Sequence, residues 1–186
     1  MWEDKIILGV DPGTSILGYG IIHVQQKQLL LLNFGILNIS KSKTHPDKLK
    51  LIFEKIDKLI QDYKPDEMSI EAPFYGKNIQ SMLKLGRAQG VAIAAALKNN
   101  IPIEEYTPRR IKQAITGNGN ASKEQVAGML QNLLSFKEIP KYLDATDGLA
   151  VAVCHHFSKG VGEHNKTNSG NWNAFIKENQ KRVIKK

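Results

Sequence analysis

The sequence predicts a single α/β domain, because short apolar runs typical of strands alternate with longer amphipathic patterns typical of helices. Its 186 residues, 41% of them hydrophobic and 24% charged, suit one domain with a packed core. The acidic residues add a third observation, since two of them directly follow predicted strands. In an α/β sheet, functional groups collect beyond the carboxyl ends of strands.

The amino-terminal part is predicted to form three strands. Residues 6–10 are continuously apolar and end at Asp11, as a strand buried on both faces does when it meets a turn. Residues 18–24 and 29–39 follow as two more strands, joined near residues 25–28. That junction lacks the Asn-Gly or Asp-Gly pair of a tight hairpin, so the turn type stays open.

The middle of the chain is predicted to form a helix, a short strand and a second helix. Apolar positions at three-and-four spacing predict a helix over residues 47–63. The short run at residues 68–70 predicts a strand that ends at Glu71, and a long helix is expected over residues 78–98. Two strand ends therefore carry one carboxylate each.

The remaining elements are shorter. Residues 101–103 are expected as an edge strand, where a proline is tolerated. Thr107-Pro108 opens a helical turn, and Ser122-x-x-Gln125 has the form of a capping box before another helix. The last helix is expected from Asp144 to about residue 157.

Charge and composition restrict the class of protein. The net charge of +8 and a pI near 9.5 favour a polyanionic partner, with nucleic acid ahead of an anionic membrane surface. No run of about 18 apolar residues and no signal peptide is found, so a soluble cytoplasmic protein is expected. The single cysteine, Cys154, is interpreted as a small buried hydrophobe, not as part of a disulfide or zinc site.

The composition changes after Ser158 to Gly, Asn, Lys and Ser, with seven Lys and Arg against two Glu. We therefore divide the chain into a domain of residues 1–158 and a basic, disordered tail of residues 159–186. A weak helix near Phe175 and Ile176 is the one element expected within that tail.

Two further acids lie on the last predicted helix. Asp144 and Asp147 are three residues apart, roughly 60° around the helix axis and about 4.5 Å along it, so both can face one point. Together with Asp11 and Glu71 they are expected to form a cluster of four carboxylates. Taken one at a time, each acid also has an ordinary structural role: Asp11 as a turn residue, Glu71 as a loop acid, Asp144 as a helix cap, and Asp147 as a complement to the helix dipole.

Four carboxylates in one pocket repel one another at neutral pH unless a divalent cation supplies the opposite charge. Hard oxygen ligands select magnesium, with manganese as a substitute, and not zinc. Two such ions lower the pKa of an attacking water and stabilise the leaving oxygen in a phosphoryl displacement. The cluster and the positive charge together predict a metal-dependent DNA endonuclease.

Several motifs resemble, in order and at similar separations, the RuvC family of Holliday-junction resolvases from about residue 5 to residue 158. They are Ile7–Thr14, Gly18-Tyr19-Gly20, Ile70–Phe74, Gly86–Gly90, Tyr106-Thr107-Pro108 and Asp144–Ala150. The resemblance implies a ribonuclease-H-like fold with a mixed five-stranded sheet flanked by helices. It also implies a homodimer that makes paired nicks in a four-way junction, two magnesium ions held by Asp11, Glu71, Asp144 and Asp147, and a branch-migration motor as partner.

The resemblance also implies DNA-binding residues. Phe74 matches an aromatic residue that inserts at the junction core, although most phenylalanines are simply core residues. Lys112 and Lys123 match basic positions near the cut strand. Arg109 and Arg110 are further candidates for phosphate contacts, with a solvated basic face as an equal alternative.

Dimerisation has a candidate surface on the helix of residues 78–98. Gly86, Gly90 and Ala94 fall on one stripe at four-residue spacing, where small side chains allow close approach. The stripe packs either across the dimer or on the chain's own sheet, and the sequence leaves both open. His155 and His156 lie too far along the last helix to share the acids' metals, so a structural role is expected.

Two other functions are weighed against the nuclease. The segment from Gly9 to Thr14 is also similar to the phosphate loop of sugar kinases and actin-like ATPases, but those need a second domain and a second such loop. A junction-binding protein without catalysis would use the basic charge alone, and the presence of all four acids argues against it.

Overall fold

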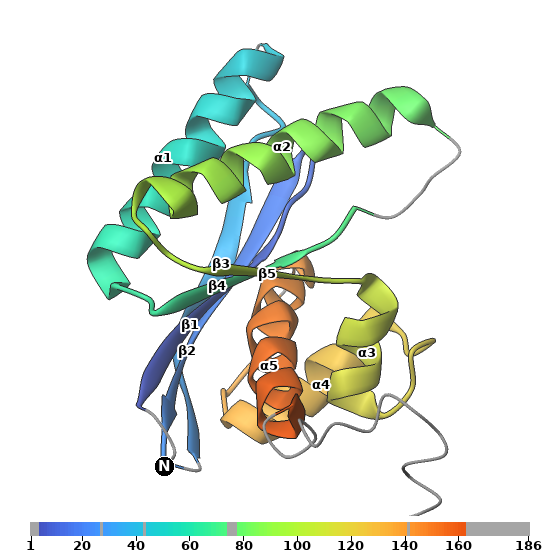
Figure 1. Cartoon of the computed structure of the whole chain (residues 1–186). Coiled ribbons are helices and arrows are strands. Elements are labelled where there is room, and N and C mark those ends of the chain that lie inside the picture. Colours follow the sequence, from blue (N-terminus) through green and yellow to red (C-terminus); the bar gives the residue numbers. More distant parts are fainter. Residues whose placement is uncertain (1–3, 27, 43, 74–77, 141, 163–186) are drawn as a thin grey trace, which may run out of the picture.

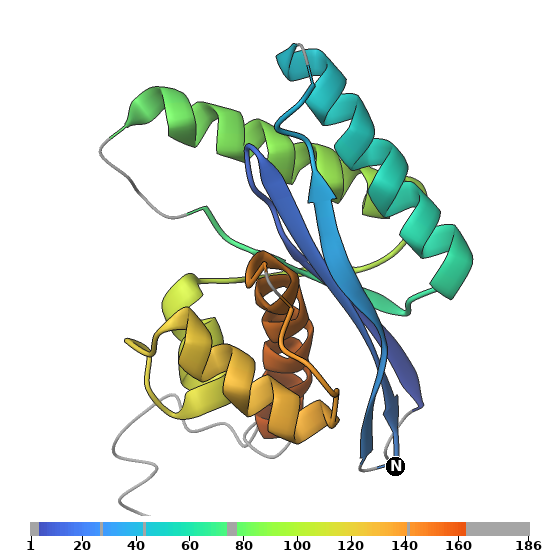
Figure 2. The same ribbon diagram turned by 180° about the vertical axis from the view of Figure 1, so that it is seen from behind.

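The computed structural model describes residues 4–26, 28–42, 44–73, 78–140 and 142–162. Five strands form one mixed sheet in the order β3-β2-β1-β4-β5. Helices α1 and α2 cover one face of this sheet, and α3, α4 and α5 lie on the other (Figures 1 and 2). The predicted α/β class is confirmed, with two helical layers enclosing a sheet.

The strands are β1 (Lys5–Asp11), β2 (Ile16–Gln25), β3 (Gln28–Asn38), β4 (Glu67–Glu71) and β5 (Ile103–Tyr106). The helices are α1 (His45–Tyr63), α2 (Ile79–Lys98), α3 (Pro108–Thr116), α4 (Lys123–Leu134) and α5 (Asp144–Gly162). The tail from residue 163 onward, with the helix expected near Phe175 and Ile176, lies outside the described residues.

The pairing of β1 and β4 positions two of the acids. These strands are parallel, with Val10 opposite Ile70, whereas β1 pairs with β2 in antiparallel fashion. Asp11 and Glu71 are the next residues on each strand, so they leave the same edge of the sheet side by side. The predicted strand ends at both acids are confirmed.

The prediction for the edge strand is wrong in its bounds. It was expected over residues 101–103, but β5 begins at Ile103 and pairs with β4 from Met68↔Ile103 to Glu71↔Tyr106. Pro102 has no N–H and only accepts, through its carbonyl oxygen, from the N–H of Met68 at 2.9 Å. The pairing of β5 with β4 therefore begins after the proline and extends to Tyr106, opposite Glu71.

Local capping explains where three helices begin. Thr44 and Ser122 each form a capping box at the start of α1 and α4. Thr107 caps α3, and Pro108 occupies its first turn, as the sequence predicts. At the other end of the chain, α5 extends to Gly162, beyond its expected end near residue 157.

Each face of the sheet has its own core. The side under α1 and α2 is centred on Leu8, Ile21 and Ile56, and the side under α3 to α5 on Ile22, Leu149 and other buried residues. Cys154 is fully buried in the second core, which confirms its predicted burial. Within the described ranges, no helix is long and apolar enough to cross a membrane.

Candidate active site

Helix α5 lies directly on the backbone of β1 and β2, which determines where its acids fall. A Cβ atom built on Gly18 would lie 1.9 Å from the carbonyl oxygen of Asp144, and one built on Gly148 would lie 2.4 Å from the nitrogen of Tyr19. Neither position tolerates a side chain at this separation. Because Gly18 and Gly148 have no Cβ atoms, the start of α5 lies directly against β2, the strand that follows Asp11 in the chain.

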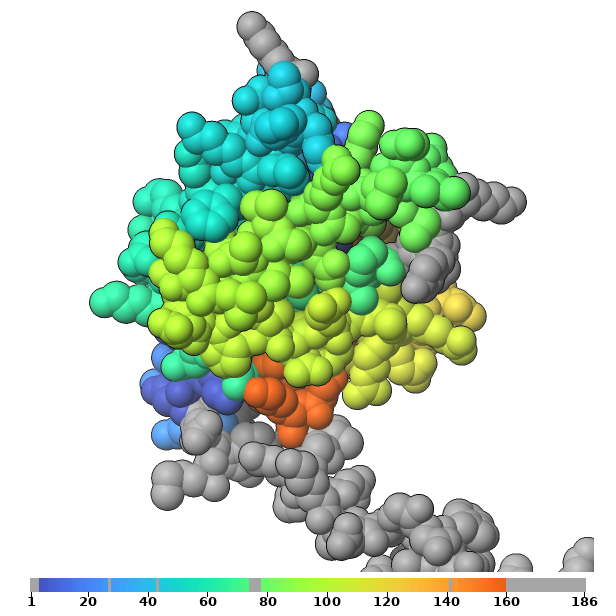
Figure 3. Space-filling model, turned by 45° about the horizontal axis from the view of Figure 1, so that its top comes forward, coloured from blue at the N-terminus to red at the C-terminus, as the bar shows by residue number. Residues whose placement is uncertain are grey.

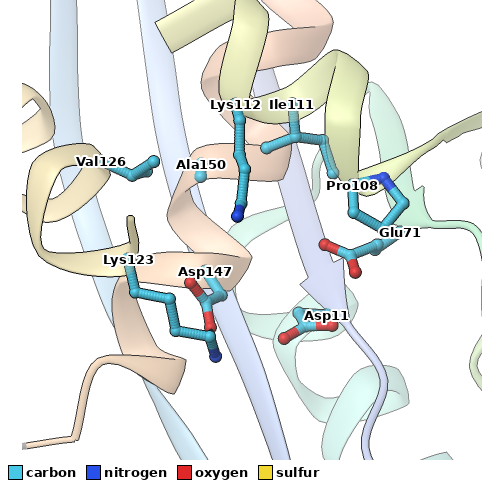
Figure 4. A pocket seen from close by; sticks show the side chains of 9 residues that line it. All are labelled: Asp11, Glu71, Pro108, Ile111, Lys112, Lys123, Val126, Asp147 and Ala150. Carbon is cyan, nitrogen blue, oxygen red and sulfur yellow. The ribbon is translucent and has the colours of Figure 1, made fainter. Parts of the chain in front are cut away.

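A pocket of about 220 Å³ opens at this edge of the sheet (Figure 4). Its lining combines three carboxylates, two lysines and apolar side chains from α3, α4 and α5. The residues are Asp11, Glu71, Pro108, Ile111, Lys112, Lys123, Val126, Asp147 and Ala150. Five elements far apart in the sequence thus meet around three of the four predicted acids.

Burial and mutual repulsion act on the two strand-end acids. Burial, followed by the charges of Glu71 and Asp147, raises the pKa of Asp11 well above its usual value. Burial and the charge of Asp147 raise the pKa of Glu71 to about 7, against the opposing effect of the lysines. The pocket therefore holds carboxylates that are costly to ionise without added positive charge.

Lys123, the first residue of α4, supplies part of that charge. Its ammonium donates to the Asp147 carboxylate and lies 3.6 Å from Oδ1 of Asp144. Burial disfavours the charged amine, but the bond to Asp147 and the nearby acids outweigh this and raise the pKa of Lys123. Burial still raises the pKa of Asp147, so one lysine compensates the cluster only in part.

Lys112 enters the pocket from α3 and points toward the acids (Figure 4). Its charge opposes the rise in the pKa of both Glu71 and Asp147. The two lysines predicted from the sequence thus both lie against the carboxylates, on the same side of the pocket as α3 and α4.

Asp144 occupies a different position from its three partners. Its side chain is 37% exposed, compared with 13% for Asp147, and it is not among the residues that line the pocket. Among the described residues, no three acidic, histidine or cysteine side chains are grouped closely enough to hold one ion as they stand. Lys123 lies between Asp144 and Asp147, where it keeps the acids of α5 paired with an amine.

Three other predicted DNA contacts have different outcomes. Arg109 and Arg110 are exposed on α3, and Nη2 of Arg110 donates to the Ser158 hydroxyl at 3.2 Å. The stem of Arg109 lies under the following loop, since a Cβ atom on Gly119 would meet its Cγ at 2.7 Å. Phe74 lies outside the described residues.

The stripe of Gly86, Gly90 and Ala94 faces away from the sheet. A Cβ atom on either glycine would meet no atom of the described residues within 4 Å, and Ala94 is exposed. Helix α2 instead buries the opposite side, including Ala88 and Ala92, on the core. The alternative of packing on the chain's own sheet is therefore wrong, and the outer side of α2 is uncovered on the surface in Figure 3.

A buried polar network beside α5 was not predicted. The Glu67 carboxylate accepts from Lys5 at 2.9 Å, from Lys159, and from Nε2 of His155 at 2.6 Å. Burial alone would raise the pKa of Glu67, but these bonds outweigh it and hold the pKa at about 2. His155, whose Nδ1 lies 2.9 Å from the Tyr106 hydroxyl, has the structural role expected of it.

The sequence offered one signal for this network. Glu67 directly follows Asp66 at the start of a short strand that contains Met68 and Ile70, and a buried acid needs a cationic partner. Its partners lie 62, 88 and 92 residues away, so the sequence alone does not identify them.

Comparison with known proteins places these features in one family. The family model for the crossover junction endodeoxyribonuclease RuvC matches residues 7–155. A protein of that name from Cytophaga hutchinsonii is 61% identical over 180 residues, covering 97% of this chain and 88% of the relative. Another from Christiangramia forsetii is 58% identical and covers 97% and 94% of the two chains.

Solved structures agree with the fold. Thermus thermophilus RuvC in complex with a Holliday junction substrate superposes with a TM-score of 0.79 at 29% identity, covering 85% of this chain and 96% of that one. The yeast mitochondrial Holliday junction resolvase has a TM-score of 0.65 at 16% identity and is similar in fold alone, over 89% of this chain and 83% of its own.

Proposed function

This chain belongs to the RuvC family of crossover junction endodeoxyribonucleases, and we propose that it resolves four-way DNA junctions by paired symmetric nicks during recombination and repair. The observation that carries the proposal is the pocket in which Asp11, Glu71 and Asp147 meet two lysines at the carboxyl edge of the sheet. Acidic side chains beside basic groups suit metal-dependent phosphodiester hydrolysis, because the acids can hold metal and the lysines can contact the DNA backbone.

We propose that Asp11, Glu71, Asp144 and Asp147 hold two divalent ions, normally magnesium and in its place manganese. The donor set fits, because all four ligands are hard oxygen groups. The raised pKa values of Asp11, Glu71 and Asp147 also fit, because bound cations remove the repulsion that makes ionisation costly. When bound, such ions lower the pKa of an attacking water and stabilise the leaving oxygen.

The lysines have separate tasks in this proposal. Lys123 compensates the acids of α5 in the absence of metal, and its amine moves toward the phosphate of the cut strand when metal takes over that charge. Lys112 reaches the same strand from α3. Arg109 and Arg110, exposed on α3, contact phosphates farther from the cut, and Phe74 stacks on an unpaired base at the junction core.

We propose that the active form is a homodimer through the outer side of α2. A two-fold protein places one site near each of the two strands to be cut in a symmetric junction. No described residue comes within 4 Å of a Cβ atom built on Gly86 or Gly90, Ala94 is exposed beside them, and three exposed large hydrophobic residues continue the stripe. These are Ile79, Leu83 and Leu97, exposed by 72%, 52% and 61%.

The dimer surface is testable separately from catalysis. Gly90→Arg places a long cation in the middle of the stripe without altering the buried side of α2. We expect the variant to run as a monomer in light scattering and to bind junctions weakly. Gly128→Arg on α4, where an added Cβ atom also meets nothing within 4 Å, is the matched control and is expected to stay dimeric. A dimeric Gly90→Arg protein would refute this interface.

The remaining expectations concern the rest of the chain and its surroundings. We propose that residues 1–158 carry the nuclease. Residues 159–162, expected as the start of the basic tail, form the last turn of α5, and we propose that the rest of the tail, to residue 186, adds nonspecific DNA affinity. We also propose that the protein acts on chromosomal DNA in the cytoplasm together with a branch-migration motor.

The decisive experiment uses a synthetic mobile four-way junction and a linear duplex, each with magnesium and with chelator. We expect symmetric nicks in the junction only, and only with magnesium. Asp11→Asn is expected to bind the junction and leave it uncut. Cutting by Asp11→Asn at the unaltered rate would refute the four-carboxylate site, and metal-dependent cutting of duplex would refute junction selectivity.

A further inference from the structure

A second cavity lies on the α1 and α2 side of the connection between β1 and β2. It measures about 370 Å³ and is bordered by hydroxyl, amine and imidazole side chains, with no acid among the described residues that line it. The lining residues are Thr14, Ser15, Ser42, Thr44, His45, Lys48, Ser81 and Lys84. Figure 2 shows that the β1–β2 connection reaches the upper end of the sheet, beside α2. We propose that this cavity binds a backbone phosphate of the junction strand, away from the phosphate that is cut.

The two lysines provide the charge. Nζ of Lys48 donates to the carbonyl oxygen of Thr14 at 3.1 Å, which fixes the amine at the cavity and leaves two of its protons for a ligand. Lys84 approaches from the second turn of α2. A phosphate oxygen between two ammonium groups gains charge-assisted hydrogen bonds from both.

His45 gives an independent indication of a ligand. Its Nε2 atom is buried and has no hydrogen-bond partner among the described residues. Buried side-chain nitrogens are nearly always paired, and His45 lines the cavity, so a group bound there would supply the missing partner. His45 is also the first residue of α1, whose amino-terminal end favours an anion.

The acid in the first turn of α1 does not oppose an anion here. The Asp47 carboxylate accepts from the backbone N–H of Thr44 at 3.2 Å and from its hydroxyl at 2.7 Å. Asp47 is not among the lining residues. These bonds also occupy the Thr44 hydroxyl, so the hydroxyl donors left for a ligand are those of Thr14, Ser15, Ser42 and Ser81.

The position of the cavity selects DNA as the source of the phosphate. Thr14 follows Asp11 by three residues, so their Cα atoms are at most about 11 Å apart. One strand of a duplex carries a phosphate about every 3.4 Å along the axis. A strand whose phosphate lies at Asp11 therefore brings a second phosphate to this cavity within a few nucleotides. This step rests on the proposed function, which supplies the strand at Asp11.

The test pairs a protein change with a DNA change. Lys48→Ala/Lys84→Ala is compared with Lys50→Ala/Lys58→Ala, which removes the same charge from exposed positions of α1. Junctions carry a single neutral methylphosphonate at successive positions of the cut strand. Junction affinity is measured in chelator at several salt concentrations, and cleavage is measured with magnesium.

We expect the unaltered protein and the control to bind more weakly when the methylphosphonate occupies one position, a few nucleotides from the cut. The cavity variant is expected to bind the normal junction about tenfold more weakly, with a salt slope that is smaller by about 0.9 per phosphate that it no longer binds. A methylphosphonate at that one position should no longer change the junction affinity of the cavity variant. Ser81→Ala, which leaves Lys48 and its bond to Thr14 intact, should show the same change in weaker form.

Three outcomes would overturn the inference. In one, the cavity variant binds junctions with the same affinity as the control. In another, its affinity is lower, but no single methylphosphonate position affects the unaltered protein more than the others. The third is binding of inorganic phosphate to the unaltered protein, detected by the His45 ring resonances, with no coupled position in the junction. Failure of the unaltered protein to bind or cut junctions would instead refute the proposed function.

Discussion

The ammonium of Lys123 donates to Asp147 and lies 3.6 Å from Asp144, so that an amine from α4 compensates both acids of α5. This arrangement couples the stability of the metal-free protein to its catalytic residues. Without the amine, the two carboxylates would repel each other at neutral pH with no cation between them.

We therefore predict that Lys123→Met lowers the free energy of unfolding of the metal-free protein at pH 8. Because Lys123 is half exposed, the expected decrease is about 0.5–1 kcal/mol. The decrease should shrink toward pH 5, where the acids with raised pKa values bind protons. Denaturant unfolding in chelator measures it, with Lys123→Arg as the charge-preserving control; a more stable Lys123→Met at pH 8 would contradict the prediction.

Asp11→Asn is predicted to stabilise the protein that it inactivates. Burial and three neighbouring acids make the Asp11 carboxylate costly to ionise, and the amide removes that cost. A gain of about 1 kcal/mol corresponds to a Tm higher by roughly 2–4 °C for a chain of this size.

Thermal melts in chelator at pH 8 test this, with Asp62→Asn on the exposed face of α1 as the same substitution outside the site. Added magnesium is expected to raise the Tm of the unaltered protein more than that of Asp11→Asn. A lower Tm for Asp11→Asn in chelator would mean that the carboxylate stabilises the fold.

The raised pKa of Glu71 predicts how the stability of the fold depends on pH. Its pKa in the folded chain is about 7, above the usual 4.5, so the folded state binds a proton that the unfolded state has released between these values. Stability from this group is therefore present at low pH and is lost as the pH rises through about 7. Glu71→Gln should match the unaltered protein near pH 4.5 and exceed it at pH 8 by about 1–3 kcal/mol.

Comparing the two proteins at each pH cancels the contributions of other groups. Glu67 has a pKa near 2, so its contribution to stability is lost as the pH falls below its usual pKa of 4.5. The pKa of the buried His155 is lowered, so its contribution is lost as the pH falls through its usual pKa of 6.5. Both act in the opposite direction to Glu71. A difference that is constant from pH 4.5 to 8 would show that Glu71 does not titrate as proposed.

Two truncated proteins that end only four residues apart are predicted to differ in melting temperature. Ending the chain at Gly162 keeps Lys159 and its contact with the Glu67 carboxylate, whereas ending it at Ser158 removes that cation from a largely buried acid. We expect the shorter protein to melt a few degrees lower, while both cut junctions at temperatures where they are folded.

Both truncations also remove six Lys and Arg and two Glu from residues 163–186. Their junction affinity should therefore fall, more at low salt than at high salt, with a slightly larger decrease for the shorter protein, which also loses Lys159. Equal melting temperatures for the two proteins would show that the interaction of Lys159 with Glu67 contributes nothing.

The sequence predicts the strand ends of the site well because the relevant signals are local. The run before Asp11 is apolar without a break, and the short run before Glu71 ends at a proline-containing turn. Both strands end where predicted, and the parallel pairing that places the two acids side by side follows from the fold class. The helix starts at Thr107 and Ser122 are equally local, since each is set by a capping side chain.

The sequence predicts less wherever two distant elements meet. Lys123 and Asp147 are 24 residues apart, and nothing near either residue identifies the other as its partner. The glycines show the same limit. Their spacing on α2 predicts a close approach, but Gly86 and Gly90 face outward, while Gly18 and Gly148 make the close contact between sheet and helix.

That contact means that the spacing of the acids depends on residues with no functional group. A single methyl group at Gly18 or Gly148 would push α5 off the sheet and carry Asp144 and Asp147 away from Asp11. Each acid would keep its chemistry, but the distances on which shared ions depend would change. A variant with every charged residue intact would then be inactive, because two positions without side chains set the separation between the strand-end acids and the helical ones.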